Sequence, residues 1–195
     1  MLSNRDIRDW LPRLHRGGGR ACQAFFLALL AALFAIYSTT LLLPYAYLDD
    51  YSHLYNVFAH PLGEFKSLAD QGRPLNGLIL LAVFRHIGGL PGMWKARALT
   101  LIGLACLAWI FHAALRANGW RTGAFLFTII LCTVPAVQVY AAWATSVQIP
   151  LAGICAVTAA LVAALAVENL RHRWPVALAA AALMLIAATI YQPAA

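Results

Sequence analysis

Apolar and polar residues occur in long blocks along this chain. The clearest apolar block extends from residue 21 to residue 43 and contains no charged residue. At about 1.5 Å per helical residue, it is long enough to cross the roughly 30 Å hydrocarbon layer of a bilayer. Polar links such as "RANGWR" and "ENLRHRW" separate the later apolar blocks, which lie near 75–90, 97–115, 122–141, 145–167 and 174–192.

These blocks predict an all-α, polytopic membrane protein with five to six transmembrane helices. Backbone polar groups cannot remain unpaired in lipid, so each block that spans the bilayer must be a helix. Composition agrees, because 63% of the residues are hydrophobic and 11% are charged, with a mean hydropathy of +0.75. In soluble domains, by contrast, about a quarter of the residues are charged.

The residues before the first block predict the orientation. They include Arg5, Arg8, Arg13, Arg16 and Arg20. An arginine-rich flank marks the cytoplasmic side of a membrane span. The block ends in "LPYAYLDD" without a small-x-small cleavage site, so we interpret it as an uncleaved anchor. We therefore expect four regions: a basic cytoplasmic N-terminus (1–20), a first transmembrane helix (21–44), an extracytoplasmic loop (45–74) and a helical bundle (75–195).

The loop 45–74 has a helical pattern of its own. Its apolar residues recur at spacings of three and four, with an interruption at "HPLG". They are Leu54, Val57, Phe58, Leu62, Phe65 and Leu68. This pattern predicts two short juxtamembrane helices that lie on the membrane surface with their polar faces toward water.

The number of crossings stays open between five and six. In the six-crossing arrangement, Arg85, Lys95 and Arg97 lie on the cytoplasmic side; in the five-crossing arrangement, residues 75–97 dip into the membrane and return. The distribution of Lys and Arg separates the two weakly, and segment length slightly favours six crossings. Only five crossings would bring the polar stretch of Trp143, Thr145, Ser146 and Gln148 to the side of the loop.

Charge and cysteine usage exclude several classes of partner. The net charge of +7 comes mostly from the N-terminal arginines, which suit topology and contact with anionic lipids. No nucleic-acid-binding module is visible, so nucleic acid is not an expected partner. The cysteines lie singly in apolar blocks, without the spacing of a zinc site or a disulfide framework.

Three motifs occur in an ordered series: "LDDYSHLY", "ADQGRPLNGLIL" and "ATIYQ". The series resembles the polyprenyl-phosphate-glucose-dependent glucosyltransferases that modify bacterial O-antigen, and the broader C-type glycosyltransferase architecture. This resemblance implies a bacterial inner-membrane enzyme that transfers glucose from a polyprenyl-phosphate donor to a cell-surface glycan, with 45–74 as its catalytic loop. Members of this family are considerably longer, so the chain is expected to be an N-terminal portion.

The resemblance also implies roles for individual residues. Asp49 or Asp50 would take the proton of the acceptor hydroxyl or hold a divalent metal ion, and Arg73 would bind the donor phosphate. Adjacent residues point in different directions, so one of the two carboxylates is expected to face the sugar, and we favour Asp49, with Asp50 ordering the loop or joining a metal site. Further candidate substrate-binding residues are His53, Gln71, Tyr191 and Gln192.

Each of these residues also has a plainer interpretation. The two aspartates are equally compatible with a solvated linker, and Arg73 with an interfacial arginine paired with Asp70 or lipid. A rival function is a transporter or flippase component, because polar residues near helix ends also mark substrate pathways. Against it, no Asp, Glu or Lys lies deep in a predicted span, and no inverted repeat is visible.

Overall fold

The computed structural model describes residues 19–117, 119–168 and 173–191. Over these ranges the chain is all-helical and contains no strand, which confirms the all-α part of the predicted fold class. The α-helices are α3 (Gly19–Ile36), α4 (Ser38–Leu42), α5 (Leu48–Ala59), α6 (Pro61–Asp70), α7 (Pro74–Ile87), α8 (Met93–Ala117), α9 (Arg121–Thr133), α10 (Pro135–Ala142), α11 (Gln148–Glu168) and α12 (Arg173–Ile190). Two short 3-10 helices complete the set, η1 (Leu90–Gly92) and η2 (Ala144–Val147).

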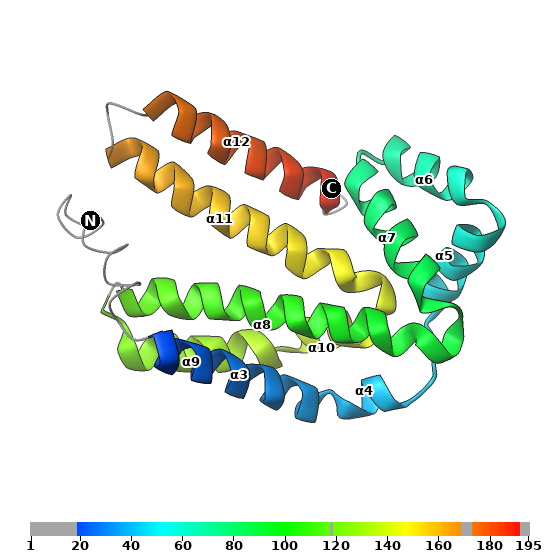
Figure 1. Ribbon diagram of the computed structural model, residues 1–195, viewed down its shortest axis with the longest axis horizontal. Coiled ribbons are helices and arrows are strands. Elements are labelled where there is room, and N and C mark those ends of the chain that lie inside the picture. The colour runs from blue at the N-terminus through cyan, green and yellow to red at the C-terminus, as the bar shows by residue number, and fades with distance from the viewer. Residues whose placement is uncertain (1–18, 118, 169–172, 192–195) are drawn as a thin grey trace.

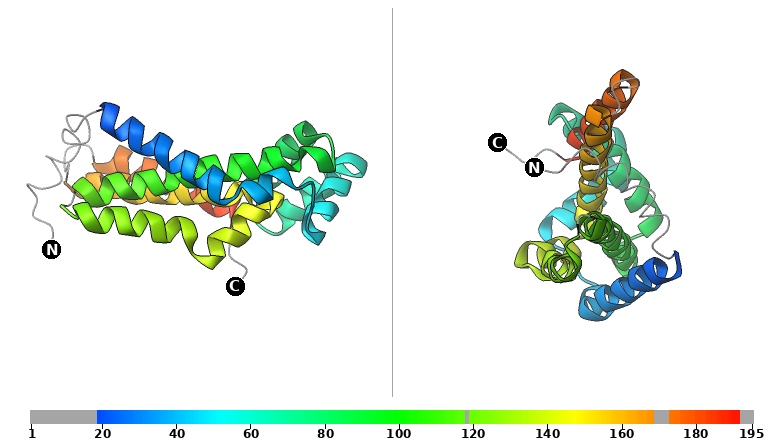
Figure 2. Two further views of the ribbon diagram at one scale, coloured as in Figure 1. Left: turned by 90° about the horizontal axis from the view of Figure 1, so that it is seen from below. Right: turned by 90° about the vertical axis from the view of Figure 1, so that its left-hand side faces the viewer.

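The long helices lie roughly along one axis, and three shorter helices gather at one end (Figure 1). Helix α8 contacts α3, α9 and α11, while α11 and α12 form a long antiparallel pair (Figures 1 and 2). Helices α5, α6 and α7 form the group at the end of the bundle, on the right of Figure 1. We call this the α5–α7 end of the molecule.

Glycines allow α8 and α11 to pack closely. A Cβ atom added at Gly103 of α8 would come within 2.9 Å of Pro150 Cβ. A Cβ atom at Gly153 of α11 would come within 2.9 Å of Leu107 Cδ2. Small residues at such crossings are typical of helices that associate in lipid, where close van der Waals packing replaces the hydrophobic driving force.

Two of the described helical segments are long and apolar enough to cross a membrane, Leu90–Arg116 and Ala144–Ala164. A third span results if Thr122–Thr133 and Pro135–Ala142, which meet at a bend of 52°, are taken together. The remaining apolar helices are shorter than a typical span, and they include Gln23–Ile36, which lies in the block predicted as the first transmembrane helix and ends before Tyr37. The chain therefore has the helices of a membrane protein, with two to three clear spanning segments in the described residues.

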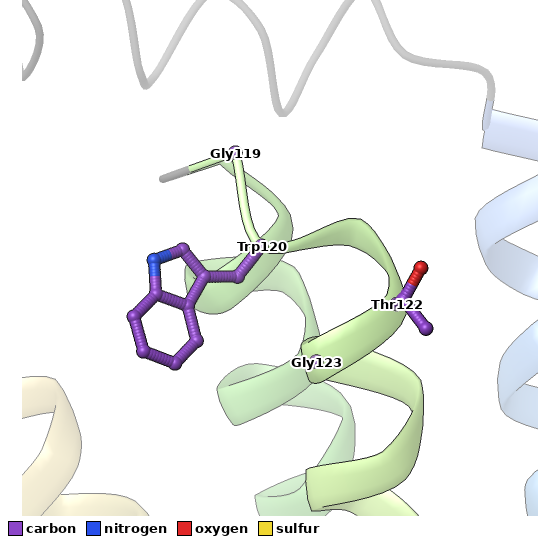
Figure 3. A pocket seen from close by; sticks show the side chains of 4 residues that line it. All are labelled: Gly119, Trp120, Thr122 and Gly123. Carbon is purple, nitrogen blue, oxygen red and sulfur yellow. The ribbon is translucent and has the colours of Figure 1, made fainter.

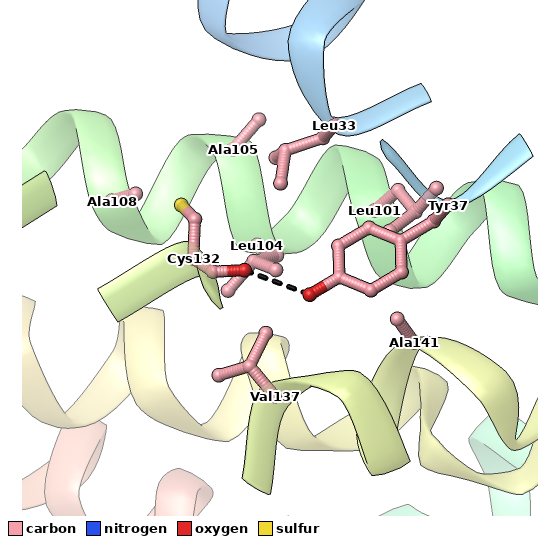
Figure 4. Close-up of a cluster of buried hydrophobic side chains, with 9 residues drawn as sticks. All are labelled: Leu33, Tyr37, Leu101, Leu104, Ala105, Ala108, Cys132, Val137 and Ala141. Atoms are coloured by element: carbon pink, nitrogen blue, oxygen red, sulfur yellow. Dashed lines mark hydrogen bonds between the residues drawn. The ribbon is translucent and has the colours of Figure 1, made fainter. Parts of the chain in front are cut away.

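The break between α9 and α10 interrupts the block 122–141, which the sequence pattern predicted as one span. Pro135 has no amide hydrogen, and it disfavours a helical conformation at Val134, whose ψ is 147°. The break leaves the carbonyl of Cys132 outside the regular helical ladder. The hydroxyl of Tyr37 donates to this carbonyl at 2.8 Å, inside a cluster of buried apolar side chains (Figure 4). A partner of this kind is needed because lipid offers none.

The end of the segment 75–97 lies beside the start of the loop 45–74. Gly88 ends α7 with a φ of 72°, a left-handed conformation that glycine adopts readily. At the start of α8, the Arg97 guanidinium donates to the backbone carbonyl of Tyr45, in the segment that leads into α5. The contact bears on the two arrangements that the sequence left open, because the six-crossing one expects Arg97 and Tyr45 on opposite sides of the membrane.

Candidate functional site

Helix α5 presents three different faces, because successive residues of a helix project about 100° apart. The buried face holds Asp50, Leu54 and Val57 and packs against the bundle. The polar face holds Asp49, Ser52, His53 and Asn56. The third face is an exposed apolar stripe, formed by Leu48, Tyr51, Tyr55 and Phe58.

Asp50 is completely buried and accepts hydrogen bonds from three backbone amides. Its Oδ1 atom accepts a hydrogen bond from the amide of Thr145 at 2.9 Å. Its Oδ2 atom accepts hydrogen bonds from the amides of Ala144 at 3.3 Å and Tyr47 at 3.2 Å. Asp50 therefore caps α5 and ties it to η2, a structural role within the loop that the sequence analysis considered for this residue.

Arg97 also binds the backbone in this region, through its guanidinium group. Its side chain is completely buried, and Nε donates to the carbonyl of Ala142 at 2.8 Å while Nη1 donates to the carbonyl of Thr40 at 3.0 Å. The guanidinium also lies 3.9 Å from the centre of the Tyr45 ring. Burial raises the pKa of the Tyr45 phenol, an effect that the positive charge of Arg97 opposes. Arg97 and Asp50 thus both bind the backbone of residues 142–145. Arg97 donates to the carbonyl of Ala142, and Asp50 accepts from the amides of Ala144 and Thr145.

The polar stretch that begins at Trp143 consequently lies against the loop. Thr145, Ser146 and Gln148 are buried, and the Trp143 ring lies 5.4 Å from the Tyr47 ring. Gln148 Oε1 is buried without a hydrogen-bond partner among the described residues. The sequence analysis expected this stretch beside the loop only in the arrangement with five crossings.

The adjacent aspartates do not fit a divalent metal ion. Both oxygens of Asp50 are occupied by amides, whereas Asp49 is exposed on a different face. Within the described ranges, no group of three or more His, Cys, Asp or Glu side chains comes together. Hard divalent ions take several oxygen ligands, and this pair offers a single free carboxylate.

Glu64 joins the site although the sequence analysis did not select it. It is 5% exposed, and its Oε1 atom is hydrogen-bonded to His53 Nδ1. Its Oε2 atom accepts a hydrogen bond from Asn56 Nδ2 at 2.9 Å. The signal available in the sequence was an acidic residue one turn after Pro61, where a helix N-terminus stabilises negative charge.

Arg73 and Gln71 lie in the turn between α6 and α7. Gln71 is the exposed C-cap of α6. The amides of Gly72 and Arg73 donate hydrogen bonds to the carbonyls of Ala69 and Leu68, respectively, at 2.9 Å each. Arg73 is half-buried, and its Nε atom has no hydrogen-bond partner in the described part of the chain. No ion pair with Asp70 is formed within that part, so the guanidinium is not committed to this neighbour.

Tyr191 follows α12 and is half-buried. Its amide donates to the carbonyl of Ala187 at 3.0 Å. The C-terminal end of α12 lies beside the start of α7, so Tyr191 is at the same end of the molecule as Arg73 (Figure 1). Gln192 lies outside the described residues. Across those residues, no hydrogen bond or ion pair joins the polar face of α5 to Arg73 or Tyr191.

A depression of about 350 Å³ lies in the turn between α8 and α9, far from this region (Figure 3). Its lining residues are Gly119, Trp120, Thr122 and Gly123. None of these side chains titrates, and the depression is at the opposite end of α8 from Arg97. It is therefore not a candidate for acid–base chemistry.

Comparison of the chain with protein-family models, with characterised proteins and with solved structures found no significant match in any of the three. The candidate site is thus defined by its own geometry. The candidate residues are the exposed Asp49, His53 with its contact to Glu64, and Arg73 at the start of α7.

Proposed function

We propose that this chain is a membrane glycosyltransferase that moves glucose from a polyprenyl-phosphate donor to a cell-surface glycan such as O-antigen. The observation that supports the proposal best is the polar face of α5, where the exposed Asp49 precedes His53 by about one helical turn. This face lies at one end of an otherwise apolar bundle. Sugar transfer from a lipid phosphate needs polar groups at such a boundary.

In the proposed membrane arrangement, the N-terminus is cytoplasmic and the α5–α7 end faces the outside of a bacterial inner membrane. Five segments cross, namely α3–α4, α8, α9–α10, α11 and α12, while α7 enters and returns. The arginines before residue 21 support this orientation. The contact between Arg97 and Tyr45 supports five crossings over six.

The exposed apolar stripe of α5 suits the membrane–water interface on the outer side of the inner membrane. Tyr51 and Tyr55 are 47% and 64% exposed, and Leu48 and Phe58 flank them at helical spacing. Tyrosine is enriched where an apolar region meets lipid headgroups. With this stripe against the lipid, the polar face would lie at headgroup level, where the sugar of a lipid-linked donor is presented.

Individual residues then have distinct proposed roles. Asp49 binds hydroxyl groups of the reacting sugars, because a carboxylate accepts several hydrogen bonds. Arg73 binds the donor phosphate through its planar guanidinium, which matches phosphate oxygens. Gln71, Tyr191 and Gln192 are the further proposed sugar contacts.

The test measures transfer of radiolabelled glucose from polyprenyl-phosphate glucose to lipopolysaccharide in membranes that contain the full chain. Wild-type protein should transfer label, and Arg73→Ala should require a higher donor concentration, with Arg73→Lys intermediate. The matched control is Arg116→Ala, an exposed arginine at the other end of α8. Movement of the labelled donor across the membrane without transfer would instead support a transporter or flippase.

A further inference from the structure

We propose that His53, oriented by Glu64, is the base that removes the proton from the acceptor hydroxyl. This inference rests on the proposed glucosyl transfer and adds to it the identity of the proton acceptor. It arises from a partly buried carboxylate–imidazole contact that joins α5 to α6.

The contact defines which ring nitrogen of His53 is free. An ionised carboxylate only accepts hydrogen bonds, so Nδ1, which contacts Glu64 Oε1, carries the ring proton. The lone pair of Nε2 is then available to a substrate. The imidazole side chain is 27% exposed, whereas the Glu64 side chain is 5% exposed, so the ring rather than the carboxylate is open to the polar face of α5.

Glu64 is itself held in place. Asn56 donates to its second oxygen at 2.9 Å, and its backbone amide donates to the carbonyl of His60 at 2.9 Å. It also lies in the first turn of α6, where the helix dipole favours negative charge. These contacts fix the carboxylate that orients the His53 ring.

In the proposed step, one bond to the anomeric carbon forms as another breaks. The acceptor hydroxyl oxygen forms a bond to the anomeric carbon of glucose while the bond from that carbon to the phosphate oxygen breaks, and its electron pair stays on the phosphate. The hydroxyl proton passes to His53 Nε2. The products are the glucosylated glycan, polyprenyl phosphate and an imidazolium that later returns its proton to water.

His53 suits this task better than Asp49. Histidine is the side chain that most often acts as a general base, and the contact with Glu64 involves only Nδ1 of this ring. Asp49 is exposed, and no side chain of the described residues forms a hydrogen bond or ion pair with it. Asp49 thus remains free to bind sugar hydroxyls beside the base.

The experiment uses membranes with the full chain, radiolabelled polyprenyl-phosphate glucose and lipopolysaccharide. His53→Ala should lower kcat by about 10²- to 10⁴-fold with little change in the donor KM, and added imidazole should restore part of the rate. Glu64→Gln should lower kcat by about 10- to 100-fold, because it removes one charged hydrogen bond. His53→Asn, whose amide keeps a donor toward Glu64, should be as slow as His53→Ala and guards against misfolding.

The control is His60→Ala, an exposed histidine on the same helical hairpin. It should keep the wild-type rate and should not respond to imidazole. A wild-type rate for His53→Ala, or a loss that imidazole does not restore, overturns the assignment of the base and leaves glucosyl transfer in place. Absence of transfer by the wild-type chain overturns the proposed function and this inference with it.

Discussion

The carboxylate of Asp50 accepts a hydrogen bond from the amide of Thr145, a residue 95 positions further along the chain. The preceding residue, Asp49, is exposed and points elsewhere. Two adjacent carboxylates therefore occupy opposite environments, one inside the protein and one at its surface. The buried Asp50 holds α5 against η2, and the exposed Asp49 is free to contact a substrate.

Replacing Asp50 should destabilise the protein. Asp50→Asn keeps the shape of the side chain but removes the charge and turns an amide group toward backbone N–H donors. Since hydrogen bonds to charged groups contribute about 1.5–3 kcal/mol each, we expect a loss of about 2–4 kcal/mol of stability. Thermal unfolding in detergent measures this loss as a lower Tm.

Asp49→Asn is the matched control for stability. It makes the same chemical change one residue earlier, on the exposed face, and should leave Tm within about 1 °C, since exposed substitutions change stability little. Equal Tm values for the two variants would show that the amide contacts of Asp50 do not stabilise the fold.

Some of these features were predictable from the sequence, and others depended on distant contacts. Hydrophobic blocks gave the all-helical fold, and the spacing in 45–74 gave two short helices, observed as α5 and α6. Val57 and Leu68 are buried as core residues, yet Phe58 and Leu62 of the same pattern are 55% and 84% exposed. Spacing shows which residues share a face, but it does not show which of two apolar faces meets the protein.

The partners of the site residues could not be predicted in the same way. Asp50 meets residues 144 and 145 because the chain folds back on itself, and no local pattern encodes that encounter. Glu64 becomes part of the site through its contact with His53 across the turn between α5 and α6. The break at Pro135 did have a local signal, but the apolar block around it obscured the bend.

Arg97 should be as important for folding as Asp50. Arg97→Met leaves the partly buried carbonyls of Ala142 and Thr40 without their donor, at a cost of about 1 kcal/mol or more for each group. Arg85→Met, at an exposed position of α7, should change stability little. Thermal unfolding of both variants makes the comparison, and equal Tm values would rule out a structural role for Arg97.

Tyr37→Phe isolates the hydrogen bond at the break between α9 and α10. It removes only the hydroxyl that donates to the Cys132 carbonyl, so a loss of about 0.5–1.5 kcal/mol is expected. The unfolding midpoint in a detergent titration measures it. A variant as stable as wild type would mean that another group satisfies this carbonyl.

The five-crossing arrangement predicts which positions share a side of the membrane. Single cysteines at Ser52 and Lys95, both exposed, should react with an impermeant thiol reagent in intact cells, in a protein whose own cysteines are replaced. A cysteine at Thr122, exposed at the other end of the bundle, should react only after lysis. Labelling of Ser52 but not Lys95 in intact cells would restore the six-crossing arrangement.

The division of roles between Asp49 and Asp50 is tested most directly by glucosyl transfer from polyprenyl-phosphate glucose, measured per molecule of folded protein. Asp49→Asn should keep the wild-type Tm and lose at least about 100-fold in rate, because a misplaced sugar reacts far more slowly. Asp70→Asn, an exposed aspartate at the end of α6, should transfer at the wild-type rate. Wild-type transfer by Asp49→Asn would contradict the account, because the exposed carboxylate of α5 would then have no part in the reaction.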